Sequence, residues 1–239
     1  MSKQEMFDFK FYEWEKKFHD RPFLRQPFGD RWETYSWSET GQMARKLATG
    51  LQSLGLRKNA HIGLISKNCR EWVIADLAIM MAGYISVPFF PSLKGEELKF
   101  LIDYGDVDLL FVGKIETWEN IKDHIPKNLP LIAFPQYKGC SKVDRGQQWF
   151  NFIDQHQPLQ NPHKPKLSDI WTIIFTSGTT GNPKGVELSF LALDQTKIIT
   201  EQVNPLKIDF SGNNDFISYL PLNHIAERVV VEHVCLRFG

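Results

Sequence analysis

The chain has 239 residues, enough to bury a hydrophobic core, and its 42% hydrophobic and 23% charged residues are typical of a globular protein. Its 28 basic residues balance 28 acidic ones, so no net charge favours nucleic acid or an anionic membrane as a partner. The three cysteines have neither CxxC nor Cys/His metal spacing, which argues against a zinc motif or a disulfide framework and indicates a reducing, cytoplasmic location.

The first quarter of the chain predicts two helices and two strands. Residues 7–19 place apolar side chains on one helical face, and residues 32–37 alternate in the manner of a strand. Ser38 is positioned to cap a helix that ends near Gly55, because serine is favoured at a helix start and glycine just past a helix end. Residues 61–65 predict a short buried strand.

One apolar stretch, residues 72–90, is nearly long enough to span a bilayer. It contains an aspartate near its start and is interrupted by Gly83 and Pro88. A buried helix at about 71–82 followed by a buried strand at 84–90 explains these breaks better than a membrane span. We therefore expect no transmembrane segment, and the mixed charges at the N-terminus are not those of a signal peptide.

Helix and strand patterns continue to alternate in the middle of the chain. Residues 96–104 predict a helix, and residues 108–112 and 129–134 predict strands. This rhythm predicts an α/β fold with a largely parallel sheet flanked by helices. The polar, proline-rich stretch 155–168 predicts a surface connector within one domain in preference to a boundary between two.

A loop rich in glycine and hydroxyl side chains follows the next predicted strand. Residues 170–175 are β-branched and aromatic, and residues 176–185 read TSGTTGNPKG. Glycines let backbone N–H groups turn toward one point, small hydroxyls add donors, and Lys184 adds a positive charge. Such a surface suits a polyphosphate. A helix with Ser189 as its N-cap is expected after the loop.

Other phosphate-binding loops do not match this spacing. A Walker A loop requires GxxxxGK[ST], whereas Lys184 follows Pro183 and precedes Gly185, and the dinucleotide fingerprint GxGxxG is absent. A ligand-free surface loop is the remaining alternative. The strand before the loop, the expected helix after it and the lysine make that alternative the weaker interpretation.

A second motif lies about forty residues further on. Residues 215–222 predict a strand that ends at a proline, and the string NHIAER follows at 223–228. Taken alone, His224 is more often a structural histidine than a functional one. Glu227 with Arg228 is usually a surface pair or a packing ion pair.

Both motifs together resemble one enzyme family. FTSGTTGNPKGV, at 175–186, looks like the signature of the adenylate-forming (AMP-binding) superfamily. YLPLNHIAER, at 219–228, is similar to the YLPLxHxxER segment of the long-chain acyl-CoA synthetase branch. The resemblance covers nearly the whole chain, although only 174–186 is highly specific, and it implies that residues 1–239 are the N-terminal portion of the large AMP-binding domain.

The resemblance implies a reaction and roles for individual residues. In this family the loop holds the β- and γ-phosphates of ATP while a carboxylate attacks the α-phosphate, and coenzyme A then accepts the acyl group. The residue matching His224 lies near the acyl carboxylate, which makes it the catalytic candidate, and the hydroxyl of Thr176 is a candidate ligand for Mg²⁺. Many members have a histidine where this chain has Phe190. The implied phosphate-binding residues are Thr176, Ser177, Gly178, Thr179, Thr180, Gly181 and Lys184.

Several family segments are not among the 239 residues. The adenine-binding segment, the ribose-binding aspartate and the small C-terminal domain with its catalytic lysine would follow, so we expect an N-terminal fragment of a longer ligase that does not catalyse adenylation alone. A ligase for an aryl, amino or short-chain acid and a non-catalytic truncated paralogue or interaction module stay open as alternatives. The expected partners are small-molecule substrates and not nucleic acid; peripheral membrane contact and a homodimer formed through exposed apolar surface also stay open.

Overall fold

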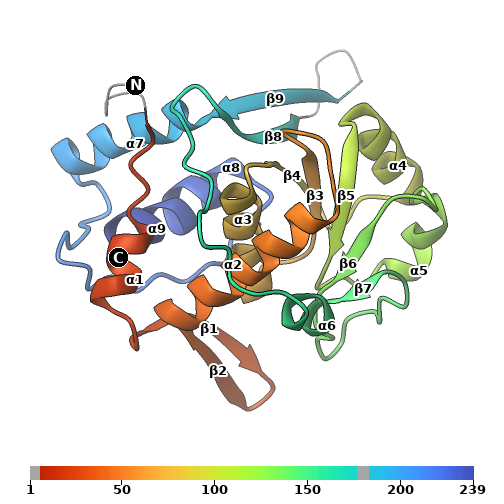
Figure 1. The fold of residues 1–239 in the computed structure, drawn as a ribbon, viewed down its shortest axis with the longest axis horizontal. Helices are drawn as coiled ribbons and strands as arrows, with labels where there is room; N and C mark the ends of the chain where they lie inside the picture. The colour runs from red at the N-terminus through yellow and green to blue at the C-terminus, as the bar shows by residue number, and fades with distance from the viewer. Residues whose placement is uncertain (1–5, 177–182) are drawn as a thin grey trace.

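The computed structural model describes residues 6–176 and 183–239 of the chain. Its centre is a seven-stranded sheet in the order β7-β6-β5-β3-β4-β8-β9, parallel throughout except for the antiparallel pair β8 and β9 (Figure 1). The predicted α/β fold with a largely parallel sheet is therefore confirmed. The strands are β3 (His61–Ile65), β4 (Ile85–Phe89), β5 (Val107–Val112), β6 (Leu131–Ala133), β7 (Gln147–Gln148), β8 (Ile170–Thr176) and β9 (Lys184–Ser189).

Helices cover both faces of this sheet. In β3, Ile62 and Leu64 join the hydrophobic cluster on one face, whereas Ile65 joins the cluster on the other. Successive strand residues point to opposite faces, so a strand buried on both faces is apolar throughout. The first cluster includes residues of α1 (Phe11–Lys17), α2 (Trp37–Ser53), α3 (Arg70–Ala82) and α6 (Trp149–Asp154). The second cluster includes residues of α4 (Gly95–Tyr104) and α5 (Trp118–Ile121). The 3₁₀ turn η2 (Lys122–His124) follows α5.

The start of α2 is set by a capping box that differs from our expectation. β1 (Pro22–Phe28) and β2 (Arg31–Ser36) form an antiparallel hairpin that leads directly into the helix. The Ser36 hydroxyl accepts from the backbone N–H of Glu39, and the Glu39 carboxylate accepts from the backbone N–H of Ser36. Ser38 as the N-cap was therefore wrong: the residue three positions after it is a glycine, which offers no carboxylate to complete such a box.

The apolar stretch forms the buried helix α3 and the buried strand β4, within a residue of the prediction. Gly83 ends the helix with φ of +82°, a left-handed conformation that glycine adopts without steric cost. Among the residues that the structure describes, no helix is long and apolar enough to cross a membrane.

The connector at 155–168 lies along the outside of the helical layer. The backbone N–H of Leu159 donates to the carbonyl of Arg45 in α2, at 3.2 Å, and the N–H of Phe7 donates to the carbonyl of Pro165, at 2.9 Å. The first helix begins at residue 11 and not at 7 as predicted. β8 follows the connector and pairs with β4, so the chain on either side of the connector contributes to one sheet.

The last third of the chain differs most from expectation. Residues 215–222 form no strand, and no strand of the described residues pairs with them, so the predicted strand is wrong. Ile217 and Tyr219 are 82% and 77% exposed. A strand needs a backbone partner as well as an apolar pattern, and the pattern alone does not reveal the partner. The segment lies between α7 (Phe190–Val203) and a run formed by α8 (Ile225–Glu227), the π-helix η3 (Arg228–His233) and α9 (Val234–Phe238).

Candidate nucleotide and acid site

The glycine-rich loop connects two strands, not a strand and a helix. β8 ends at Thr176 and β9 begins at Lys184, and these two exposed residues lie opposite each other at the open end of the antiparallel pair. The predicted phosphate-binding residues Ser177, Gly178, Thr179, Thr180 and Gly181 lie outside the described residues.

The helix expected after the loop begins at the predicted place, but a strand that was not predicted precedes it. The six residues of β9 intervene, and α7 then begins at Phe190. Ser189 is its N-cap residue, as predicted, although its hydroxyl makes no capping hydrogen bond. The loop is therefore tied at both ends to one hydrogen-bonded ladder.

The end of this hairpin packs against the core. The ring of Phe175 stacks on Phe89 with centroids 6.0 Å apart, and it contacts Tyr104 of α4 at 5.9 Å. A Cβ atom on Gly185 would lie 3.2 Å from Ile173 and 3.3 Å from Phe175, closer than side chains ordinarily allow. A glycine at 185 therefore lets β9 lie flat against β8, which fixes the positions of the residues on either side of the loop.

β8 is tied in its middle to the second motif. The Thr172 hydroxyl donates to the carbonyl of Ser86 at 2.7 Å and accepts from the guanidinium of Arg228, also at 2.7 Å. Arg228 is fully buried, and its Nη2 donates to both carboxylate oxygens of Asp76 in α3 at 2.7 Å. Helix α3, strand β8 and the second motif thus meet at one guanidinium.

The buried guanidinium has further partners. It lies over the Trp171 ring at 4.0 Å and near the Trp72 ring at 5.2 Å, within the range of cation–π contacts. Its Nε lies 3.5 Å from a carboxylate oxygen of Glu232. Of the two readings for Glu227 with Arg228, a surface pair is ruled out because both are buried, and the carboxylates that lie within ion-pair distance of Arg228 are those of Asp76 and Glu232.

Glu232 and His233 are buried beside this ion pair. Burial raises the pKa of Glu232 well above its ordinary value, with the Asp76 charge adding to the effect. Burial lowers the pKa of His233 to about 3, and the nearby cations Arg237 and Arg228 act in the same direction. Both side chains line a cavity of about 20 Å³, which is large enough for one water molecule.

His224 lies at the surface, between the two ends of its motif. Its Nδ1 accepts from the backbone N–H of Ala226 at 3.2 Å, so His224 caps the short helix α8. Among the described residues, no hydrogen bond or ion pair joins His224 to Thr176 or Lys184.

The backbone just before His224 is held by Asn68, from the loop between β3 and α3. The Asn68 amide donates to the Ser218 hydroxyl at 2.8 Å and to the Leu220 carbonyl at 2.7 Å. Its carbonyl oxygen accepts from the backbone N–H of Leu222 at 2.9 Å. The Asn68 side chain therefore supplies some of the hydrogen bonds that a neighbouring strand would otherwise have made to this backbone.

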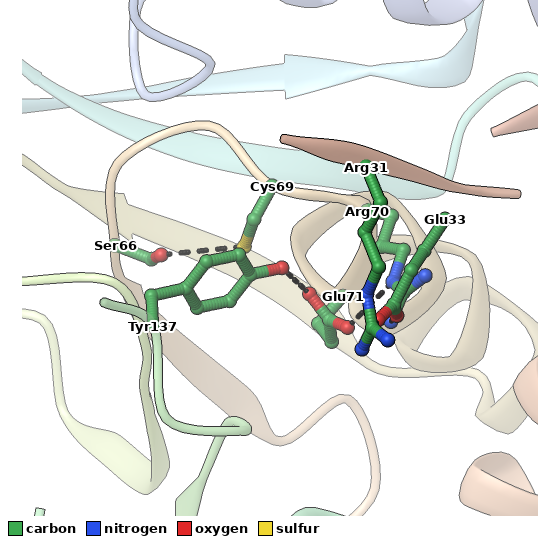
Figure 2. Close-up of polar contacts among 7 residues, drawn as sticks. All are labelled: Arg31, Glu33, Ser66, Cys69, Arg70, Glu71 and Tyr137. Atoms are coloured by element: carbon green, nitrogen blue, oxygen red, sulfur yellow. Dashed lines mark hydrogen bonds and ion pairs between the residues drawn. The ribbon is translucent and has the colours of Figure 1, made fainter. Parts of the chain in front are cut away.

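The N-terminal end of α3 is fixed by a buried polar network (Figure 2). Glu71, fully buried, accepts from the Tyr137 hydroxyl and from Arg70 Nε, the latter at 3.0 Å. Arg70 also donates to Glu33 of β2 at 2.8 Å. Burial raises the pKa of Tyr137, so its hydroxyl stays protonated and able to donate. The network joins β2, α3 and the segment after β6.

Cys69 lies in the same region without reactive character. Its thiol contacts the Ser66 hydroxyl at 3.6 Å, as Figure 2 shows, and burial raises its pKa to about 12. Because the thiolate is the nucleophilic form, this cysteine is a packing residue. All three cysteines of the chain are free.

The geometry agrees with a family match that covers nearly the whole chain. Residues 11–239 match the sequence profile of the family described as AMP-binding enzyme. The chain belongs to the AMP-binding enzyme family. The hairpin of β8 and β9 in this AMP-binding chain carries the family's glycine-rich signature.

Curated relatives of this AMP-binding chain include long-chain fatty acid ligases. It is 28% identical over 238 residues to the long-chain-fatty-acid–CoA ligase ACSBG2 of Mus musculus, covering 96% of this chain and 36% of the relative. It is 30% identical over 218 residues to long chain acyl-CoA synthetase 4 of Arabidopsis thaliana, covering 84% and 32%. The chain thus spans about a third of the length of these relatives.

Solved structures of adenylate-forming enzymes share the fold. The long-chain-fatty-acid–CoA ligase FadD1 of Archaeoglobus fulgidus superposes with a TM-score of 0.77 at 21% identity, covering 98% of this chain and 46% of that one. ATP-bound MatB of Rhodopseudomonas palustris superposes with a TM-score of 0.73 at 20% identity, covering 95% and 43%.

Three residues of this AMP-binding chain that organise the site were missed by sequence reasoning. They are Asn68, Asp76 and Thr172, which contact the second motif but belong to earlier segments. Asp76 carried a usable signal, because a carboxylate inside an otherwise apolar buried helix requires a buried cation or donor. Asn68 and Thr172 carried none, since asparagine in a loop and threonine in a strand are ordinary.

Proposed function

We propose that the protein to which this chain contributes is an AMP-forming long-chain fatty acid–CoA ligase of the cytoplasm, acting in lipid metabolism. The observation that carries the proposal is the signature FTSGTTGNPKGV at the β8–β9 hairpin of an AMP-binding family member. The curated relatives named above support the choice of a long-chain acid.

The first step is adenylation of the fatty acid. A carboxylate oxygen attacks the α-phosphorus of ATP, the bond from that phosphorus to the bridging oxygen breaks, and pyrophosphate leaves. Negative charge moves onto the departing pyrophosphate, where donors and cations fixed in advance lower the barrier. The ammonium of Lys184 and the hydroxyls of Thr176, Ser177, Thr179 and Thr180 are the proposed groups, because Lys184 and Thr176 stand on either side of the loop.

Mg²⁺ and ATP suit the exposed end of β8. The hydroxyl of Thr176 offers the hard oxygen donor that Mg²⁺ prefers, and Mg²⁺ characteristically binds phosphate oxygens together with few protein ligands. When bound, Mg²⁺ supplies charge neutralisation of the polyphosphate.

His224 is the proposed contact for the acid. Because its Nδ1 accepts a backbone hydrogen bond, the neutral imidazole carries its proton on Nε2. That N–H can donate to an oxygen of the fatty acid carboxylate and orient it for attack. In the second step the thiol sulfur of coenzyme A attacks the acyl carbon, its proton is lost, and AMP leaves.

Exchange of labelled pyrophosphate into ATP tests the proposal. For the protein expressed from its native gene, we expect exchange with long-chain fatty acids to exceed exchange with aryl, amino and short-chain acids. A preference for one of those other acids would show that the substrate is not a long-chain fatty acid, and the proposed adenylation reaction would still stand. No exchange with any acid would favour a non-catalytic protein.

A further inference from the structure

Two anchors bracket His224, one on each side along the chain. On the N-terminal side, Asn68 makes the three hydrogen bonds to residues 218, 220 and 222 described above. On the C-terminal side, Arg228 is bound by Asp76 and Thr172. Asp76 lies within α3 and Asn68 lies two residues before its first residue, so both anchors come from one region of the fold.

Helix α3 is itself held rigidly. Its first turn is bound through the Glu71 network in Figure 2, and twelve of its thirteen residues are buried. Residues 217–221, by contrast, are exposed, and segment 215–222 has no strand partner among the described residues. The position of His224 therefore depends on the burial of Leu222 and on contacts with α3 and the loop before it, and not on a ladder of its own.

We propose that Asn68 is a positioning residue for the acid side of the site, holding His224 in a set place relative to the β8–β9 hairpin. The inference rests on the proposed function and identifies a determinant of acid binding in that site. The connection runs from Asn68 through α3 and Asp76 to Arg228, and from Arg228 to Thr172 on the hairpin strand.

Of the two anchors, Asn68 is the one that can be altered without unfolding the core. Its side chain is half-buried at the surface, and water can satisfy the groups that its removal leaves. Arg228 is fully buried, so its loss would leave Asp76 as an uncompensated buried charge.

The test combines hydrogen exchange with steady-state kinetics on Asn68→Ala. In the 239-residue chain, we expect the Leu222 amide to exchange about tenfold faster, because its acceptor is gone. In the protein expressed from its native gene, we expect the KM for palmitate to rise about tenfold with the KM for ATP unchanged, since a tenfold change corresponds to the loss of about one or two such hydrogen bonds.

Two variants refine the interpretation. Asn68→Asp keeps the acceptor for Leu222 but places a carboxylate oxygen against the Leu220 carbonyl in place of the donor, so the palmitate KM should rise above that of wild type. Lys67→Ala is the matched control: it removes the exposed pair with Glu116 in the same loop without touching 218–222, and its palmitate KM should equal that of wild type.

Each other outcome contradicts a defined statement. An unchanged palmitate KM in Asn68→Ala, with a wild-type protein that is active, overturns the positioning role alone. An equal rise in the KM for ATP and palmitate overturns it too, because it indicates general loosening of the fold. A wild-type protein that is inactive with every carboxylic acid overturns the proposed function and this inference together.

Discussion

The two parts of the site differ sharply in how they are held. Arg228 and its partners lie in the core, where two aromatic rings, a carboxylate and a hydroxyl surround one guanidinium. Thr176, Lys184 and His224 lie at the surface with few contacts of their own. The side chains proposed to carry the chemistry are thus separate from the buried residues that connect the hairpin to the second motif, and we expect mutation to separate their effects on stability and on rate.

The buried side of this comparison should give the largest effect. Replacing Arg228 with Met is expected to lower the free energy of unfolding by about 3–5 kcal/mol, because Asp76 is left buried and unpaired. Denaturant unfolding of the 239-residue chain measures the change. The double variant with Asp76→Leu should recover part of the loss, and strictly additive losses would contradict the pair.

At the exposed residues, mutation should lower activity and leave stability nearly unchanged. Lys184→Ala is expected to slow adenylation by about 10²-fold, as the loss of one charge-stabilising group does in other active sites. The free energy of unfolding should stay within about 0.5 kcal/mol of wild type, because Lys184 is exposed. Unchanged pyrophosphate exchange in this variant would remove Lys184 from the site.

A smaller effect concerns the pH dependence of the buried side. Because the pKa of His233 is lowered from 6.5 to about 3, the folded protein keeps this imidazole neutral where the unfolded chain protonates it. The unfolded state thus binds the extra proton, and stability falls as the pH falls from about 6.5 toward 3. The slope from this residue alone approaches about 1.4 kcal/mol per pH unit.

His233→Met should flatten that acid limb, measured as unfolding free energy against pH. The raised pKa of Glu232 has the opposite effect: it lowers the free energy of unfolding as the pH rises above the ordinary pKa of a glutamate. Wild type and variant both contain Glu232, so this effect is present in both curves. Equal slopes for His233→Met and wild type would show that His233 is protonated in the fold.

How far the sequence predicts this molecule depends on whether a feature is local. The strand at 61–65 and the helix of the apolar stretch follow from patterns within a few residues, and both were predicted to within a residue. The strand at 215–222 was wrong because pairing needs a partner elsewhere in the chain. The hairpin strand β9 was missed because KGVELS alternates only weakly between apolar and polar residues.

The site shows the same division. The signature motifs identify the exposed groups by type and spacing, which sequence displays directly. The link from Thr172 to Arg228 joins residues 56 positions apart, and that from Asp76 to Arg228 joins residues 152 apart. Only the fold brings Thr172, Asp76 and Arg228 together. The sequence alone does not show which buried polar side chains pair, because many pairings are possible.

The hairpin has an electrostatic consequence for nucleotide binding. In a strand–loop–helix site, the helix macrodipole contributes about half a positive charge beside the phosphates. Here Lys184 is the first residue of β9 and α7 begins six positions later at Phe190, a distance of about 20 Å at 3.3 Å per residue, beyond the reach of that dipole. In the proposed site the Lys184 ammonium would supply positive charge that the helix does not, and we expect nucleotide affinity to fall as the ionic strength rises.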